Sequence, residues 1–169
     1  MLAFRILNRA IILSIIGLLA QSNSTQAKEW RGIVPLHSTR TDVERLLGPP
    51  TIDRSDTTIH ELKTERVYFD YSKDSCALEL DACKVPRDTV IRIVVEPKAS
   101  QVRFTDLKLD MAKYQKSQHE HVLYIFYYLN ETEGLRYEVD ESSGLVTLVN
   151  YFSAEKDREL LCQRPKPKP

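Results

Sequence analysis

The sequence predicts an α+β fold, in which short helices pack on one face of an antiparallel sheet. The segment 122–152 reads as three consecutive strands joined by two short loops, which end at Gly134 and Gly144. A capped amphipathic helix precedes the earlier strands, and a second helical pattern precedes this meander. The order helix, strands, helix, strands would divide the fold into two halves, with both helices on one face of the sheet.

Residues 1–27 have the features of a secretory signal peptide. Two arginines precede an apolar segment at 10–20, and Thr25 and Ala27 are small residues at positions −3 and −1 of a cleavage site. The apolar segment is much shorter than the ~20 residues that a transmembrane helix needs. We therefore expect cleavage after Ala27, export to a periplasm or to the extracellular space, and no permanent membrane span.

The rest of the chain is long enough for a single domain at 28–162, followed by a disordered Pro/Lys tail at 163–169. The full sequence has 24 basic and 24 acidic residues. Cleavage of the signal peptide would remove two arginines and no acid, which leaves two more acids than bases. Since the sequence shows no basic face or stripe, we expect no nucleic-acid partner.

The first helix of the domain has clear start and stop signals. Its first turn contains a capping pair, either Thr39 with Asp42 or Thr41 with Glu44. Apolar residues at i, i+3 and i+4 follow, and Gly48 with two prolines ends the pattern. This helix is too short to be stable alone, so its apolar stripe must pack on the sheet.

Two strands are predicted after this helix. The segment 51–63 is polar and predicts a loop or a frayed strand, whereas 66–71 alternates between apolar and polar residues as a half-buried strand does. A further strand at 89–96 would point three β-branched residues inward: Ile91, Ile93 and Val95.

The second half begins with a helical pattern at 106–114, although its Leu-Lys-Leu alternation leaves a strand as an alternative. The meander follows, with strands at 123–129 and 135–139 and a third strand after Gly144. A last short helix is expected at 154–161.

Cys76, Cys83 and Cys162 would remain after export, which suggests one disulfide and one free thiol. A bridge between Cys76 and Cys83 needs a turn between them, because a straight strand would hold them about 23 Å apart at ~3.3 Å per residue. The alternative pairs Cys162 with one of the other two. No thiol or histidine spacing typical of a metal site is present, so we expect no metal.

The segment Leu36–Pro50, L-H-S-T-R-T-D-V-E-R-L-L-G-P-P, resembles the opening helix of two groups of bacterial envelope proteins. One group is the SmpA/OmlA-type outer-membrane-assembly lipoproteins, and the other is the tandem-module β-lactamase inhibitor proteins. Both have a polar cap, a short helix ending in Leu-Gly-x-Pro, and then an antiparallel sheet. The resemblance implies non-catalytic binding in the envelope. Lipid anchoring is not implied, since this chain lacks a lipobox cysteine.

The strand at 123–129 is apolar on both faces, which is unusual for a sheet covered on one side only. The strand is therefore either central and covered on both sides, or it exposes an aromatic face to a partner. In the second case the candidate binding residues are Tyr124, Phe126 and Tyr128, with Arg136 and Glu138 as polar neighbours.

These observations predict an exported, non-catalytic binding or envelope-assembly module that has no cofactor and binds another envelope or extracellular protein. The alternative is a small secreted hydrolase or metal-dependent enzyme with a histidine-containing pocket. Its candidate residues are His37, His119 and His121. The two later histidines would face one side of an extended chain, but the sequence offers no third metal ligand and no identifiable nucleophile.

Overall fold

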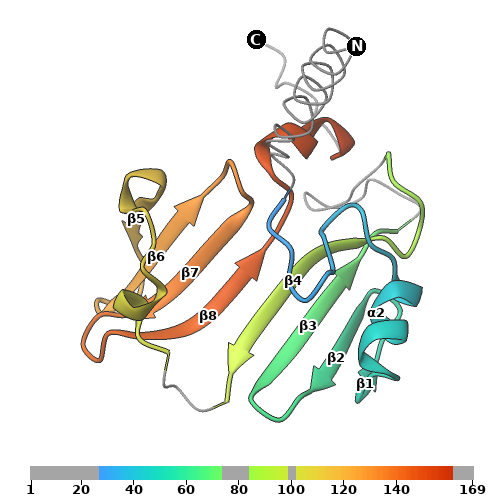
Figure 1. Ribbon diagram of the computed structural model, residues 1–169, viewed down its shortest axis with the longest axis horizontal. Coiled ribbons are helices and arrows are strands. Elements are labelled where there is room, and N and C mark those ends of the chain that lie inside the picture. The colour runs from blue at the N-terminus through green and yellow to red at the C-terminus, as the bar shows by residue number, and fades with distance from the viewer. Residues whose placement is uncertain (1–26, 74–83, 99–101, 162–169) are drawn as a thin grey trace, which may run out of the picture.

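The computed structural model describes residues 27–73, 84–98 and 102–161. These residues form an eight-stranded antiparallel sheet with the strand order β1-β2-β3-β4-β8-β7-β6-β5 (Figure 1). The strands are β1 (Ile52–Asp53), β2 (Thr57–Glu61), β3 (Glu65–Tyr71), β4 (Val90–Pro97), β5 (Gln115–Gln118), β6 (Ile125–Asn130), β7 (Leu135–Asp140) and β8 (Leu145–Tyr151). The α-helix is α2 (Arg40–Leu47), and the 3-10 helices are η1 (Phe104–Leu107), η2 (Met111–Lys113) and η3 (Glu155–Leu160).

The prediction of an α+β fold with helices packed on a sheet is wrong. Within the described ranges the sheet dominates and α2 is the one α-helix, while the patterns at 106–114 and 154–161 form short 3-10 helices. Leu107 and Leu109 both pack on the sheet although they are two residues apart, a spacing that an α-helix does not place on one face. Lys108 between them has a φ of 49°, in the left-handed region, which ends η1.

The helix predicted from the capping signals is confirmed as α2. The backbone N–H of Thr39 donates to Asp42 Oδ2 at 2.9 Å, and the N–H of Asp42 donates back to Thr39 Oγ1, which completes a capping box. Gly48 ends the helix with a φ of 79°. Val43 is fully buried in the contact between α2 and the sheet.

Of the two alternatives for the polar segment at 51–63, a loop or a frayed strand, the structure has strands, β1 and β2. Polar side chains occupy the inward positions of β2, where Thr58 and His60 are buried. Thr58 Oγ1 lies 2.9 Å from the hydroxyl of Tyr71, and the His60 ring packs edge-on against Phe69. The strand could not be recognised from an apolar alternation because the buried residues are themselves polar.

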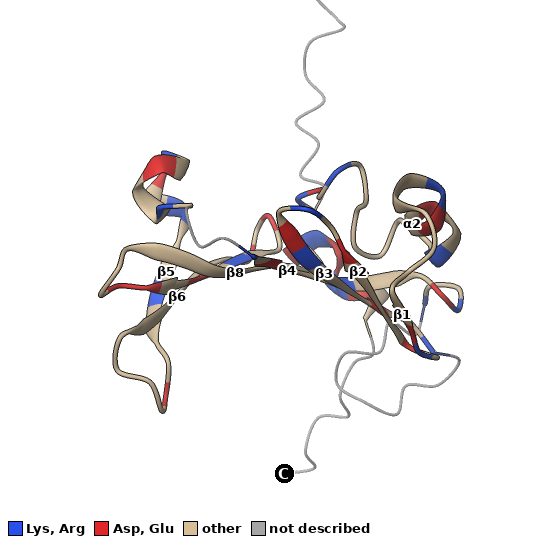
Figure 2. Cartoon of the chain, turned by 90° about the horizontal axis from the view of Figure 1, so that it is seen from below, with Lys and Arg blue, Asp and Glu red and all other residues tan. Residues whose placement is uncertain are grey.

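One face of the sheet, called the covered face here, contains both hydrophobic clusters. Cross-strand pairing aligns Val67, Val95, Val149, Tyr137 and Tyr128 in one row across five strands. The helix α2 packs on the cluster that β3 and β4 form, and the segment 102–114 packs over β6–β8. Figure 2 shows α2 and the folded segment before β5 on the same side of the sheet.

The opposite side is called the open face. Its central row is Tyr68, Val94, Asn150, Arg136 and Leu129, one position along each strand from the row on the covered face. Because neighbouring residues of a strand point to opposite faces, this row points away from both clusters.

The turn between β6 and β7 is fixed against the chain that follows β8. Gly134 has a φ of 64°, and its carbonyl accepts a hydrogen bond from the N–H of Phe152 at 2.8 Å. The N–H of Glu155 donates to the carbonyl of Glu131 at 3.0 Å. A Cβ added at Gly134 would lie 2.2 Å from the carbonyl oxygen of Phe152, so the contact requires glycine.

Several predictions from the sequence concern residues outside the described ranges. These are the signal peptide apart from Ala27, the tail at 163–169, and the disulfide choices among Cys76, Cys83 and Cys162. They stay predictions. No helix within the described ranges is long and apolar enough to cross a membrane.

Gly134→Ala should destabilise the protein more than Gly144→Ala. Both positions have a positive φ, which costs a non-glycine residue about 1–2 kcal/mol. Only at Gly134 does the added Cβ meet backbone, because nothing lies within 4 Å of the corresponding atom at Gly144. Thermal melts should therefore show a clearly larger fall in Tm for Gly134→Ala, at roughly 3 °C for each kcal/mol in a domain of this size. Equal falls would contradict the close contact with Phe152.

Alkaline pH should lower the free energy of unfolding, because it deprotonates Tyr71, which is buried in the covered face. Burial raises the pKa of Tyr71 to about 12 from the ordinary 10.0. A raised pKa in the folded state means that the stabilisation is complete below pH 10 and is lost as the pH rises from 10 to 12. The urea midpoint, followed by the fluorescence of the buried Trp30, should fall between pH 10 and pH 12. Tyr71→Phe should reduce that fall. Tyr124→Phe, at an exposed position, should leave it unchanged, and a fall that Tyr71→Phe does not alter would assign the effect elsewhere.

Candidate functional site

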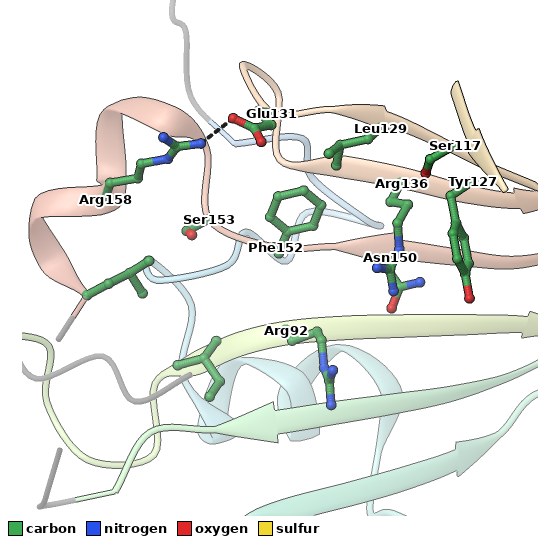
Figure 3. Close-up of a pocket in the computed structure, with 12 residues that line it drawn as sticks. Arg92, Ser117, Tyr127, Leu129, Glu131, Arg136, Asn150, Phe152, Ser153 and Arg158 are labelled. Carbon is green, nitrogen blue, oxygen red and sulfur yellow. Dashed lines mark hydrogen bonds and ion pairs between the residues drawn. The ribbon is translucent and has the colours of Figure 1, made fainter. Parts of the chain in front are cut away.

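A cleft of about 570 Å³ lies on the open face beside β6, β7 and β8 (Figure 3). The strands supply most of its lining, and the segment after β8 closes one end. Its lining residues are Ile91, Arg92, Ser117, Tyr127, Leu129, Glu131, Arg136, Asn150, Phe152, Ser153, Arg158 and Leu161. This volume falls within the range of small-molecule sites, about 300–1,000 Å³.

A β-bulge in β4 builds the wall of the cleft that faces β8. Asp70 pairs with Arg92 and Tyr71 pairs with Val90, so Ile91 is an extra residue opposite β3. The bulge allows Ile91 and Arg92 both to line the cleft while Val90 is fully buried on the covered face. The predicted inward position of Ile91 is therefore wrong, because the bulge shifts the alternation by one residue.

The end wall of the cleft comes from η3 and the residues before it. Phe152 and Ser153 follow β8 directly and are fixed by the backbone hydrogen bond to Gly134. Arg158 on η3 forms an ion pair with Glu131 in the β6–β7 turn, and Figure 3 shows this pair linking η3 to the turn. The wall is thus tied to the sheet at two points.

The floor of the cleft is set by cross-strand pairing. Arg136 on β7 pairs with Leu129 on β6 and with Asn150 on β8, so the three side chains lie in one row. The Cζ atom of Arg136 lies 4.9 Å from the centroid of the Tyr127 ring, its diagonal neighbour on β6. Figure 3 shows Arg136, Asn150 and Tyr127 side by side in the cleft.

Three guanidinium groups line the cleft, and two of them are paired with carboxylates. Arg92 Nε donates to Asp70 Oδ2 at 2.6 Å, and Arg158 pairs with Glu131. Arg136 has no ion pair with any described residue, and its Nε is buried without a hydrogen-bond partner. The cleft therefore combines apolar walls with one guanidinium group in its floor that has no ion pair with a described residue.

The five residues predicted to bind a partner do not share one surface. Phe126 and Tyr128 lie on the covered face, where Tyr128 is buried and its ring centroid is 4.2 Å from that of Phe104. Tyr124 precedes β6 and is exposed. Arg136 lies in the cleft, whereas Glu138 shares the open face but does not line the cleft.

The pairing of β6 with β7 decides which face of the sheet the aromatic residues of β6 occupy. The β6–β7 turn pairs Tyr128 with Tyr137 and Tyr127 with Glu138. The apolar positions of β7 thus share a face with Phe126 and Tyr128, and Arg136 shares its face with Tyr127 and Leu129. Counting across the predicted turn would have supplied that signal. Asn150 and the residues after β8 carry no comparable signal in the sequence.

The histidines of the predicted enzyme lie outside the cleft. His37 Nε2 lies 3.4 Å from Asp157 Oδ1 and connects the N-terminal segment to η3. His119 Nδ1 already accepts the backbone N–H of His121 at 3.0 Å. Within the described residues, no three His, Cys, Asp or Glu side chains are grouped to hold a metal ion.

No family model and no curated protein matches this chain. A solved structure does match: the crystal structure of YjgB, a DUF4309 family protein from Bacillus subtilis subsp. subtilis strain 168. The two chains are 13% identical, the match covers 75% of this chain and 85% of YjgB, and the TM-score is 0.50. None of these comparisons bears on the resemblance of Leu36–Pro50 to envelope proteins. At this identity the likeness to YjgB concerns the fold alone.

Proposed function

We propose that this protein is an exported, non-catalytic binding module whose ligand occupies the cleft on the open face. The observation that carries the proposal is that one face of the sheet is covered by other segments and the opposite face contains a cleft. The helix α2 and the segment 102–114 both pack on the covered face, and the open face is hollowed beside β6–β8. A concave site with apolar walls and few polar groups is typical of small-molecule binding.

The lining of the cleft suits an apolar ligand body. Aliphatic and aromatic surface in the lining comes from four places in the chain, at Ile91, Leu129, Phe152 and Leu161. Tyr127 adds an aromatic ring that is itself held against Arg136. Burial of an apolar ligand body against such surface is favourable by about 25 cal/mol per Å² of apolar area removed from water.

Binding is favoured over catalysis by the kinds of side chain that line the cleft. The hydroxyls in the lining are those of Ser117, Ser153 and Tyr127, and no histidine is among the described residues that line it. A serine nucleophile needs an adjacent general base within hydrogen-bond distance. The lining residues supply no such pair, so the proposal assigns no reaction to the cleft.

The uncharged fluorophore N-phenyl-1-naphthylamine tests the cleft directly. Its fluorescence should rise on binding to the native protein, and Phe152→Gln should weaken binding at least fivefold because a polar group replaces the end wall. Leu46→Gln is the matched control, since Leu46 is an exposed apolar residue on α2, which packs on the covered face. Absence of binding to the native protein, or equal weakening by both variants, would contradict the proposed site.

Export is tested by the mass of the mature chain. When the full-length sequence is expressed in a secreting bacterial host, the exported product should begin at Lys28. The control is a variant with Ala27→Leu, which should block cleavage because position −1 needs a small residue. An exported product that retains Met1 would contradict the predicted signal peptide.

A further inference from the structure

We propose that the ligand carries one acidic group in its monoanionic form, such as a carboxylate, on an apolar or aromatic body, and that Arg136 binds this group with help from Asn150. The inference rests on the proposed function and adds the chemical class of the ligand. It starts from the Arg136 side chain in the floor of the cleft, which has no ion pair with any described residue.

Two groups of charges elsewhere on the open face are matched across neighbouring strands. Asp70 on β3 accepts from Arg92 on β4, and its second oxygen accepts from Thr57 on β2. Arg66 on β3 pairs with Glu61 on β2 and with Glu96 on β4. This matching is the ordinary behaviour of opposite charges on adjacent strands.

Arg136 departs from this pattern because its cross-strand neighbours are Leu129 and Asn150, and neither is a carboxylate. Its Nε is buried and has no hydrogen-bond partner among the described residues. A buried donor without a partner costs about 1–3 kcal/mol, and more when it is charged. An anionic oxygen in the cleft would satisfy this donor with a charge-assisted hydrogen bond.

Asn150 provides a second polar group beside Arg136. Asn150 is 5% exposed, and its side chain has no hydrogen-bond partner among the described residues. A side-chain amide can donate two hydrogen bonds and accept two. Since Asn150 pairs directly with Arg136 across β7 and β8, one ligand group can reach both side chains.

The geometry favours a single negative charge. The carboxylates of Asp70 and Glu131 neutralise Arg92 and Arg158, so one guanidinium charge remains in the lining. Tyr127 packs against the Arg136 guanidinium at 4.9 Å and limits its orientations. A guanidinium binds a carboxylate in a bidentate manner, whereas a dianionic phosphate would leave one charge uncompensated here.

Two fluorophores that differ in one acidic group test the inference. The compound 8-anilino-1-naphthalenesulfonate is N-phenyl-1-naphthylamine with a sulfonate added. The anionic fluorophore should bind the native protein at least tenfold more tightly at low ionic strength, and added NaCl should reduce that advantage. Equal affinities for the two probes would overturn the inference without affecting the proposed function. Failure of both probes to bind would overturn both.

Arg136→Gln should abolish the advantage of the anionic probe, measured as the ratio of its affinity to that of the uncharged probe. Arg136→Lys should retain part of the advantage, because the charge remains but the bidentate geometry is lost. Arg45→Gln is the control for net charge, since Arg45 is an exposed arginine on α2, which packs on the covered face, and it should retain the full advantage. Near-UV circular dichroism verifies that each variant is folded. Loss of affinity for both probes in folded Arg136→Lys would assign Arg136 a structural role and overturn the inference.

Discussion

The pairing of β4 with β8 is the constraint on which the rest of the structure depends. It joins two four-stranded halves into one sheet through Val94 with Asn150 and Val95 with Val149. Because side chains alternate along a strand with a period of two, this single register decides which residues of both halves share a face. A slip of one residue in this register would turn Asn150 and Arg136 together, since β7 and β8 pair them, to the face of the first four strands that α2 covers. It would thereby remove them from Ile91 and Arg92 of β4, so the cleft depends on a contact between segments more than 50 residues apart in the chain.

Two local irregularities modify the alternation that this register imposes. In β4 the bulge at Ile91 gives the open face two successive side chains. The pairing of β7 with β8 shifts between Glu138 and Val139, which leaves Thr147 as an extra residue of β8. Thr147 Oγ1 donates to the Glu138 carboxylate at 2.9 Å, which provides Glu138 with a partner inside the sheet. Bulges commonly redirect side chains next to functional sites. Here one bulge forms a cleft wall, and the other coincides with the carboxylate nearest in sequence to Arg136.

The parts of the fold that could be predicted are those whose signals are local. The capping box at Thr39, the positive φ at Gly134 and Gly144, and the alternation in β3 all follow from residues within a few positions of one another. For β2 the sequence left a loop and a frayed strand as alternatives, because its inward positions are polar and become favourable only through contacts with Tyr71 and Phe69 of β3. The α+β class failed for a similar reason. The periodicity of the segment before β5 predicts a helix, but contacts with β6–β8 determine where its leucines lie.

The candidate site shows the same dependence on distant contacts. The sequence predicts Arg136 as a polar neighbour of an aromatic strand. The residues that surround it in the cleft are Leu129, Asn150 and Tyr127, and they come from two other strands. The apolar character of β6 on both faces now has a physical account. Its Phe126 and Tyr128 side belongs to the covered core, and its Tyr127 and Leu129 side lines the cleft. Because the residue of β6 opposite Arg136 is Leu129 and not a carboxylate, the apolar strand that lines the cleft also leaves the Arg136 guanidinium without an ion pair across β6 and β7.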